Sequence, residues 1–248
     1  MNELAGKRVL VTGAARGLGR AFAEAVVAAG GRVVLADVLV EEGNKTAAAI
    51  GKDASFVTID LADPPSIERA VAAAAEKLGG LDGLVNNAAI ATGIGGKLFD
   101  EIDIETWDRV MRVNIRGTWL VTRAAAPYLR KSGRGKIVNL ASDTALWGAP
   151  RLLHYVASIG AVFAMTRSLA RELGPDGVAV NAIAPGLTIV EATEYVPEER
   201  HRLYVDHRAM PRRQMPEDLT GTMVFLLSDA ANFVTGQLVP VNGGFVMN

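Results

Sequence analysis

The sequence predicts an α/β fold class: a single-domain, doubly wound parallel sheet of seven strands with helices on both faces. Short β-branched runs alternate with longer Ala- and Leu-rich segments of helical period. The connections are short, and right-handed β-α-β crossovers place helices on both faces of a parallel sheet. Hydrophobic residues make up 50% of the chain and aromatic residues only 6%, which favours an aliphatic core around such a sheet.

The strands are expected at residues 8–12, 32–36, 55–58, 81–85, 136–140, 178–183 and 238–241. Apolar periodicity predicts helices at about residues 18–29, 41–50, 64–78, 104–129, 154–173 and 217–227. Pro64-Pro65 and Gly30-Gly31 are typical of a helix start and a helix end, respectively.

The stretch from Pro185 to about Pro216 has no periodic pattern and is too long for a plain connector. The remaining connections contain no linker-like or low-complexity segment. We therefore expect one domain over residues 1–248, with a substrate lid at about residues 186–215.

Composition excludes several classes of function. The net charge of -1 gives no electrostatic reason to expect a nucleic acid or an anionic membrane as partner. The absence of cysteine and three scattered histidines predict no metal site. The first apolar run is too short for a signal-peptide core or a membrane span, so a cytoplasmic protein is expected.

The turn after the first strand carries three glycines in the spacing G-x-x-x-G-x-G: Gly13, Gly17 and Gly19, with Arg16 and Leu18 between them. Glycines there allow a tight turn and close approach of a pyrophosphate to a helix N-terminus, as in a Rossmann-type dinucleotide site. A plain strand-to-helix turn is the alternative interpretation.

Asp37 follows the second strand, where a carboxylate accepts hydrogen bonds from both adenosine ribose hydroxyls and repels a 2′-phosphate. This favours NAD over NADP. Arg16 is the opposing signal, because a cation beside the turn attracts a 2′-phosphate. A solvated acid at a strand end is the other interpretation of Asp37.

With these motifs the chain resembles the short-chain dehydrogenase/reductase family over essentially its whole length. The matching residues are Thr12-Gly13, Gly17, Gly19, Asp60-Leu61, Asn86-Asn87-Ala88, Asn114, Ser142, Tyr155, Pro185-Gly186, Thr188 and Asn242-Gly243-Gly244. The resemblance implies that Asp60 and Leu61 contact adenine and that Asn87 lies beside the cofactor ribose. It also implies that Pro185, Gly186 and Thr188 hold the nicotinamide carboxamide and the diphosphate.

Ser142 and Tyr155 are the candidate catalytic residues. In a dehydrogenase the hydride is handled by the nicotinamide, so the protein must hold the substrate oxygen and move its proton. Ser142 can form a hydrogen bond with the substrate oxygen, and Tyr155 can exchange the proton of the substrate hydroxyl. By resemblance, Asn114 holds a water relay.

Ile159 departs from the family pattern, because a lysine is expected four residues after the tyrosine on the same helix face. The family's lysine binds the nicotinamide ribose and lowers the tyrosine pKa. A shift from about 10 to about 7 is worth roughly 4 kcal/mol, or about a thousandfold in rate at neutral pH. Alcohol oxidation, which needs Tyr155 as base, is therefore expected to suffer more than ketone reduction.

Three interpretations of Ile159 remain open. The first is an engineered or accidental replacement in an otherwise ordinary NAD-dependent alcohol dehydrogenase/ketone reductase, which would leave a low-activity enzyme. The second is a natural variant with altered chemistry, such as a reductase of an imine-like substrate. The third is a catalytically silent NAD-binding protein. No other basic residue is an obvious substitute: His154 is expected to be a satisfied or surface residue, and Lys97 requires an inward-folded loop.

The substrate pocket is expected at the carboxyl edge of the sheet. Its candidate lining is largely apolar: Thr144, Trp147, Leu152, Leu187 and Tyr195. This favours a small hydrophobic ketone or secondary alcohol, although core packing explains Trp147 equally well. The resemblance implies a homotetramer built on two long helices and the C-terminal strand. The apolar tail Phe245-Val246-Met247 fits either an interface or packing within one subunit.

Overall fold

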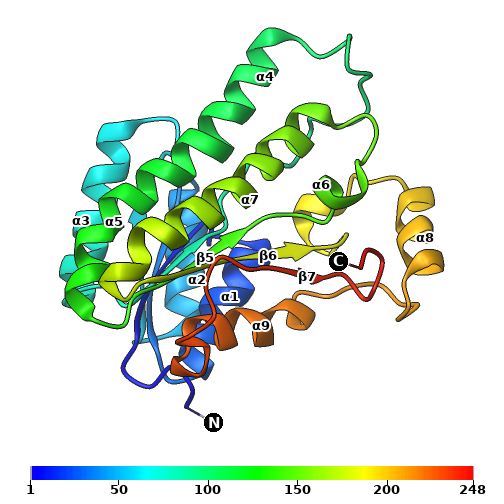
Figure 1. Cartoon of the computed structure of the whole chain (residues 1–248). Coiled ribbons are helices and arrows are strands. Elements are labelled where there is room, and N and C mark those ends of the chain that lie inside the picture. Colours follow the sequence, from blue (N-terminus) through cyan, green and yellow to red (C-terminus); the bar gives the residue numbers. More distant parts are fainter. Residues whose placement is uncertain (1, 248) are drawn as a thin grey trace.

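A computed structural model describes residues 2–247 and shows one seven-stranded, wholly parallel sheet between two layers of helices (Figure 1). The strands pair in the order β3-β2-β1-β4-β5-β6-β7. Their bounds are β1 Arg8–Thr12, β2 Arg32–Asp37, β3 Ala54–Thr58, β4 Gly83–Asn86, β5 Lys136–Leu140, β6 Ala179–Pro185 and β7 Leu238–Val241. The order reverses between β1 and β4, which places a crevice at the carboxyl ends of these two strands.

The helices divide between the two faces of the sheet. Their bounds are α1 Gly17–Ala28, α2 Val40–Ile50, α3 Pro64–Leu78, α4 Ile104–Val110, α5 Thr118–Ser132, α6 Thr144–Trp147, α7 Leu153–Leu173, α8 Glu198–His207 and α9 Glu217–Leu227. One aliphatic core packs α3, α5 and α7 against the sheet, and a second packs α1, α2 and α9 against the opposite face. Figure 1 shows α5 and α7 side by side on one face and α1 and α9 on the other. The predicted fold class is confirmed.

The predicted helix at residues 104–129 is not one regular helix. It consists of α4, the π-helical segment Met111–Gly117, and α5. A π turn holds one extra residue and is favoured only where tertiary contacts support it. Here the support comes from the side chain of Asn114, which faces the segment after β4.

The stretch from Pro185 to Pro216 is also more ordered than its pattern predicts. It contains the single turn Glu191–Thr193 and helix α8. The sequence of α8 is polar, and its buried residues are His201 and Tyr204. The helix therefore depends on a few tertiary contacts rather than on an apolar stripe. The remaining predicted boundaries coincide with the observed ones or differ from them by at most two residues.

No helix within residues 2–247 combines the length and the apolar character needed to cross a membrane. The C-terminal segment after β7 returns beside α8 (Figure 1). Phe245 of that segment packs on Trp147 and Tyr204 of the same chain.

Candidate active site

The glycine turn after β1 brings backbone, rather than side chains, to the crevice. Gly13 and Gly17 have φ values of 64° and 58°, in the left-handed region that favours glycine. A Cβ on Gly19 would lie 2.1 Å from the Gly13 carbonyl oxygen. The turn therefore requires glycine at these positions, and it leads directly into the N-terminus of α1, where free N–H groups attract anions.

Asn87, directly after β4, braces this turn. Its Nδ2 donates to the carbonyl oxygens of Thr12 and Gly13 at 3.0 and 2.9 Å. The Thr12 hydroxyl in turn accepts from the backbone N–H groups of Asn87 and Ala88, each at 3.1 Å. The donors of the Asn87 amide are thus used within the protein, and its Oδ1 remains as the acceptor that faces the crevice.

Asp37 ends β2 at the other side of the turn. Its Oδ2 accepts from the Ala15 N–H at 3.0 Å and its Oδ1 from the Leu39 N–H at 3.1 Å. The two bonds orient the carboxylate while the residue stays partly exposed. Arg16 is exposed on the same rim. The turn therefore presents one anionic and one cationic side chain at the same end of the crevice.

A cleft of about 510 Å³ runs along the carboxyl edge of the sheet from Asp37 to Tyr155. It is lined by Gly13, Arg16, Gly17, Leu18, Gly19, Asp37, Val38, Leu39, Ile59, Asp60, Leu61, Asn87, Ala88, Ala89, Ile90, Ala91, Thr92, Val113, Leu140, Ala141, Tyr155, Ile159, Pro185, Val190 and Ala192. The structure thus brings ten of the predicted cofactor-binding residues to one elongated cavity, together with Tyr155 and Ile159.

Gly186 and Thr188 lie just outside this lining. The Thr188 hydroxyl donates to the Gly186 carbonyl, and the Thr188 carbonyl accepts from Thr193. A Cβ on Gly186 would lie 2.8 Å from the Arg208 guanidinium. The two residues shape the chain between Pro185 and α8 in this structure.

Ser142 and Tyr155 meet at the inner end of the cleft. The Thr144 hydroxyl donates to Ser142 Oγ at 3.0 Å, which leaves the Ser142 proton free to be donated. Burial raises the pKa of Tyr155 to about 12. The Ser142 hydroxyl acts against this, and the nearby charge of Asp143 adds to it. Tyr155 is therefore a protonated phenol at neutral pH.

Ile159 lies one helical turn from Tyr155 and forms part of an apolar surface. It is 2% exposed and packs with Ala141, Val162 and Ala182. Among the described residues, Arg16 is the one basic side chain that lines the cleft, at the opposite end. The Tyr155 end of the cleft thus has an aliphatic wall where a cation would stabilise a phenolate.

Asn114 is buried beside this end. Its Oδ1 accepts from the Ile90 N–H at 2.7 Å, and its Nδ2 donates to the Ile90 carbonyl at 3.1 Å and to Ser158 Oγ at 3.1 Å. The Ser158 hydroxyl donates to the Tyr155 carbonyl. Asn114 therefore ties the segment after β4 to the helix that carries Tyr155.

The predicted substrate-pocket residues do not line the cleft in this structure. Thr144 contacts Ser142, and Trp147 packs edge-on against Tyr204 and Phe245. The Tyr195 hydroxyl donates to the Ala91 carbonyl at 2.8 Å, across the mouth of the cleft. Leu152 precedes α7, and the Leu187 carbonyl accepts from Arg208.

Sequence reasoning missed the small and aliphatic lining residues, which include Ile90, Ala91, Thr92, Val113, Val190 and Ala192. For all of them except Val113, which lies in the π-helical segment, the signal that could have found them was their position after β4 or β6, because those loops open onto the carboxyl edge of the sheet.

The expectation for His154 is wrong. It is neither on the surface nor satisfied: it is 0% exposed, and neither ring nitrogen has a hydrogen-bond partner among the described residues. Burial lowers its pKa, so the ring is neutral. Lys97 pairs with Asp103 at 2.9 Å on the surface and does not line the cleft.

Comparisons with known proteins agree with this geometry. A family model described as Enoyl-(Acyl carrier protein) reductase matches residues 13–246. A 3-alpha-(or 20-beta)-hydroxysteroid dehydrogenase of Mycobacterium bovis is 38% identical over 98% of this chain and 91% of its own length. A meso-2,3-butanediol dehydrogenase of Serratia marcescens is 38% identical over 96% of this chain and 94% of its own.

Among solved structures, a 3-ketoacyl-(acyl-carrier-protein) reductase from Brucella melitensis complexed with NADH has a TM-score of 0.92 and 32% identity, covering 98% of this chain and 100% of that one. The fold and the cleft define a nucleotide-binding α/β oxidoreductase. The chain belongs to the short-chain dehydrogenase/reductase family.

Proposed function

We propose that the chain is an NAD(H)-dependent oxidoreductase that interconverts a ketone and a secondary alcohol, with reduction as the favoured direction. One observation carries the proposal: a single cleft joins a glycine turn and Asp37 at one end to Tyr155 at the other, where Ser142 hydrogen-bonds Tyr155. The first end suits a dinucleotide and the second suits proton exchange with a substrate oxygen.

The residues of the cleft fit the cofactor over most of its length. Because its glycines lack a Cβ that would clash, the turn can bring its backbone N–H groups close to a diphosphate. Asp37 would hold the adenosine ribose, and Asp60 and Leu61 the adenine. Asn87 would face the second ribose, with Pro185, Gly186 and Thr188 at the nicotinamide. Asp37 favours NAD, because its charge would repel a 2′-phosphate, and exposed Arg16 is the opposing feature.

The chemistry of the chain itself is proton transfer. When bound, the nicotinamide supplies or accepts the hydride. Ser142, with its acceptor side occupied by Thr144, would donate to the carbonyl oxygen. Tyr155, with a pKa raised to about 12, would give its proton to that oxygen during reduction. As a base it is poor, since about one phenol in 10⁵ is ionised at pH 7 with such a pKa.

Ile159 explains why we propose an impaired enzyme. The aliphatic wall offers no hydrogen bond to a ribose hydroxyl and no charge to a phenolate. The missing charge weakens the step that uses Tyr155 as a base, and the missing hydrogen bond weakens ribose positioning in both directions. The apolar lining beside Tyr155 favours an uncharged, hydrophobic ketone or alcohol. The relatives are named for a hydroxysteroid and a butanediol, which are uncharged alcohols too.

A catalytically silent NAD-binding protein is the second candidate. The same observation favours it: Tyr155 has an aliphatic neighbour where a cation would be needed for efficient oxidation. In that case the glycine turn and Asp37 would still bind the cofactor.

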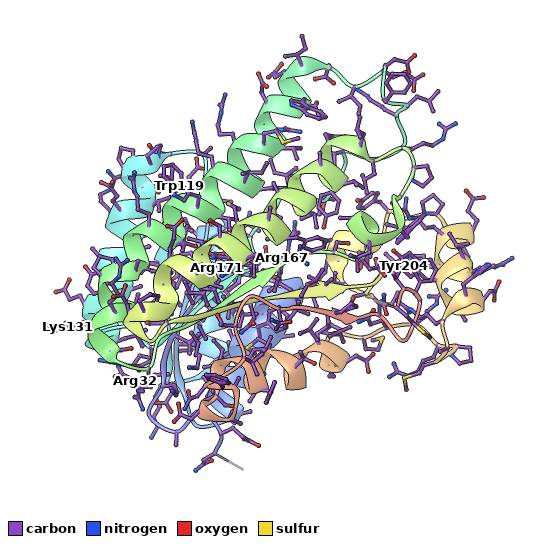
Figure 2. All side chains as sticks on the ribbon, in the orientation of Figure 1. Arg32, Trp119, Lys131, Arg167, Arg171 and Tyr204 are labelled. Atoms are coloured by element: carbon purple, nitrogen blue, oxygen red, sulfur yellow. The ribbon has the colours of Figure 1, made fainter. Side chains whose placement is uncertain are left out.

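We also propose a homotetramer in the cytoplasm. Figure 2 shows Trp119 and Lys131 on α5, and Arg167 and Arg171 on α7, on the face that these two helices present outward. Trp119 is 45% exposed, and Arg123 stacks over its ring. Light scattering coupled to size exclusion tests the assembly. The tail is a weaker candidate for an interface, because Phe245 packs within its own chain.

The test combines NADH fluorescence titration with turnover of a panel of hydrophobic ketones, secondary alcohols and cyclic imines. We expect saturable NADH binding, and ketone reduction that falls about a hundredfold or more in Tyr155→Phe. Binding without turnover of any ketone or alcohol would favour the silent protein, and turnover of imines alone would favour altered chemistry. Absence of NADH binding would overturn both candidates.

A further inference from the structure

Asp143 occupies the turn that carries Ser142. Its backbone N–H donates to the Pro185 carbonyl at 2.9 Å, and its carbonyl accepts from the Leu146 N–H at 2.8 Å. The residue is 0% exposed. Since Pro185 lines the cleft and Ser142 is the preceding residue, the backbone of Asp143 is fixed between the two.

The Asp143 carboxylate connects this turn to two distant segments. Its Oδ1 accepts from the Tyr204 hydroxyl at 2.8 Å, and Tyr204 belongs to α8. Its Oδ2 accepts from Asn242 Nδ2 at 3.3 Å, after β7. In Figure 2, Tyr204 reaches from α8 toward the turn of α6 and the C-terminal segment. One buried carboxylate thus holds the Ser142 turn, the predicted lid and the C-terminal segment together.

An aromatic cluster surrounds this contact. The Tyr204 ring stacks on Phe245 with centroids 4.2 Å apart, and Trp147 meets Phe245 edge-on at 5.6 Å. The Trp147 Nε1–H donates to the Tyr204 hydroxyl at 3.3 Å. The stacking fixes the direction of the Tyr204 hydroxyl. Its hydrogen bond to Asp143 therefore holds the two residues in a defined relative position.

The direct partners of the carboxylate are neutral donors. Arg208 acts on it through charge, but its guanidinium donates to the Leu187 carbonyl and to Gln214. Burial raises the pKa of Asp143 to about 6, against the hydrogen bonds from Tyr204 and Asn242. Burying such an anion costs stability. The carboxylate accepts from two donors, Tyr204 and Asn242, whereas an asparagine would offer one acceptor and turn an amide donor toward the other partner. A carboxylate can therefore hold both segments at once, which an amide cannot.

We propose that Asp143 is a positioning residue that fixes helix α8 to the turn carrying Ser142, so that closure of the lid and alignment of the Ser142 hydroxyl occur together. The inference rests on the proposed function for its catalytic part. Its structural part, the attachment of α8 through Asp143, stands independently.

Because burial raises the pKa of Asp143 in the attached structure, protonation of its carboxyl group favours the attachment and ionisation weakens it. The groups that face it are Tyr204 from α8, Arg208 after α8, Asn242 after β7 and Tyr155 from α7. Of these, the two tyrosines and Arg208 keep their charge state between pH 5 and pH 9, so Asp143 is the group whose ionisation weakens the attachment as pH rises through 6.

The test uses Tyr204→Phe, which keeps the stacked ring and removes the hydroxyl, and Asp143→Asn, which keeps the shape and removes the charge. Tyr128→Phe, on α5 and outside the site, is the matched control. Hydrogen exchange of residues 198–207 reports on α8. Steady-state kinetics give KM and kcat for ketone reduction, and titration gives the Kd of NADH.

We expect amide exchange in α8 to rise about tenfold or more in both variants and to stay unchanged in the control. KM should rise about fivefold to tenfold and kcat should fall, with the Kd of NADH within about twofold. In the wild type, KM should also fall as pH falls from 7 to 5, and in Asp143→Asn it should be independent of pH.

Unchanged exchange in α8 in both variants would overturn the attachment. Faster exchange with unchanged KM and kcat would overturn its role in positioning Ser142. If the wild type and Tyr128→Phe bind NADH but turn over no ketone, the proposed function fails, and the exchange data still decide whether Asp143 holds α8.

Discussion

The two ends of the cleft are built in different ways. At the end near Asp37, backbone geometry dominates: glycines without a Cβ, a helix N-terminus and an asparagine that braces the turn. At the end near Tyr155, side-chain packing dominates, and Ile159 joins a small aliphatic cluster beside the phenol. The first end has the backbone features that suit a diphosphate. The second keeps the proton donor and lacks the charge that would make it a base.

Cofactor binding and proton transfer can therefore be changed separately along one cleft. A change in the aliphatic end alters the pKa of Tyr155 and leaves the glycine turn untouched, because the two are far apart along the cleft. Conversely, a change in the glycine turn should weaken binding of the cofactor and leave the pKa of Tyr155 unchanged.

Introducing a cation at the aliphatic end should have the largest effect. In Ile159→Lys, a charge one helical turn from Tyr155 should lower the pKa of Tyr155 from about 12 toward neutrality. Alcohol oxidation at pH 7.5 should rise about a hundredfold to a thousandfold, measured as kcat/KM with NAD⁺. Ile159→Leu is the control and should change nothing. An unchanged kcat/KM for alcohol oxidation in Ile159→Lys would contradict proton transfer through Ser142 and Tyr155.

Replacing Asp143 by asparagine should change the pH dependence of stability. The folded-state pKa of about 6 lies above the ordinary value of 3.8, so protonation favours the folded state. This contribution is full below about pH 4 and is lost as pH rises through 6. The unfolding free energy of Asp143→Asn relative to wild type should therefore increase by about 3 kcal/mol from pH 4 to pH 8. Urea denaturation at both pH values measures it, and a difference that is constant with pH would refute it.

Adding a methyl group to the glycine turn should weaken cofactor binding. The Cβ of Gly19→Ala would overlap the Gly13 carbonyl, which is backbone and cannot move aside cheaply. We expect the Kd of NADH to rise about tenfold to a hundredfold. Gly221→Ala in α9, where a Cβ meets nothing within 4 Å, is the matched control. Equal affinities in the two variants would contradict the fit of the turn to a diphosphate.

Removing the carboxylate of Asp37 should have the smallest effect. In Asp37→Ser the repulsion of a 2′-phosphate disappears while Arg16 remains. The preference for NADH over NADPH should fall about tenfold, as the ratio of the two Kd values shows. A wild-type preference for NADPH would place Arg16, not Asp37, in control of cofactor choice.

The parts of the fold that the sequence predicts are those that depend on local pattern. Seven β-branched runs and their connections suffice for the parallel sheet, because strand length and apolar period are local properties. The π-helical segment at Asn114 is not predictable in this way. Its cause is a contact with Ile90, and an apolar stripe does not distinguish a helix from a helix with one extra residue.

The same division holds for the site. Gly13, Gly19 and Asp37 line the same end of the cleft, because they lie at or shortly after the carboxyl ends of β1 and β2. Trp147 turns away from the cleft, since its partners Tyr204 and Phe245 are distant in the sequence. The burial of His154, the structure of α8 and the partners of Asp143 also depend on such distant contacts.

Above all, we infer that the aliphatic end of the cleft keeps Tyr155 protonated. The most direct measurement is the pH dependence of kcat/KM for alcohol oxidation by the wild-type protein between pH 7 and pH 10. With a Tyr155 pKa raised to about 12, the value should rise about tenfold per pH unit without reaching a plateau, while ketone reduction stays flat from pH 7 to pH 9. A plateau in oxidation below pH 9 would show that the phenol ionises readily without a lysine, and it would contradict the account.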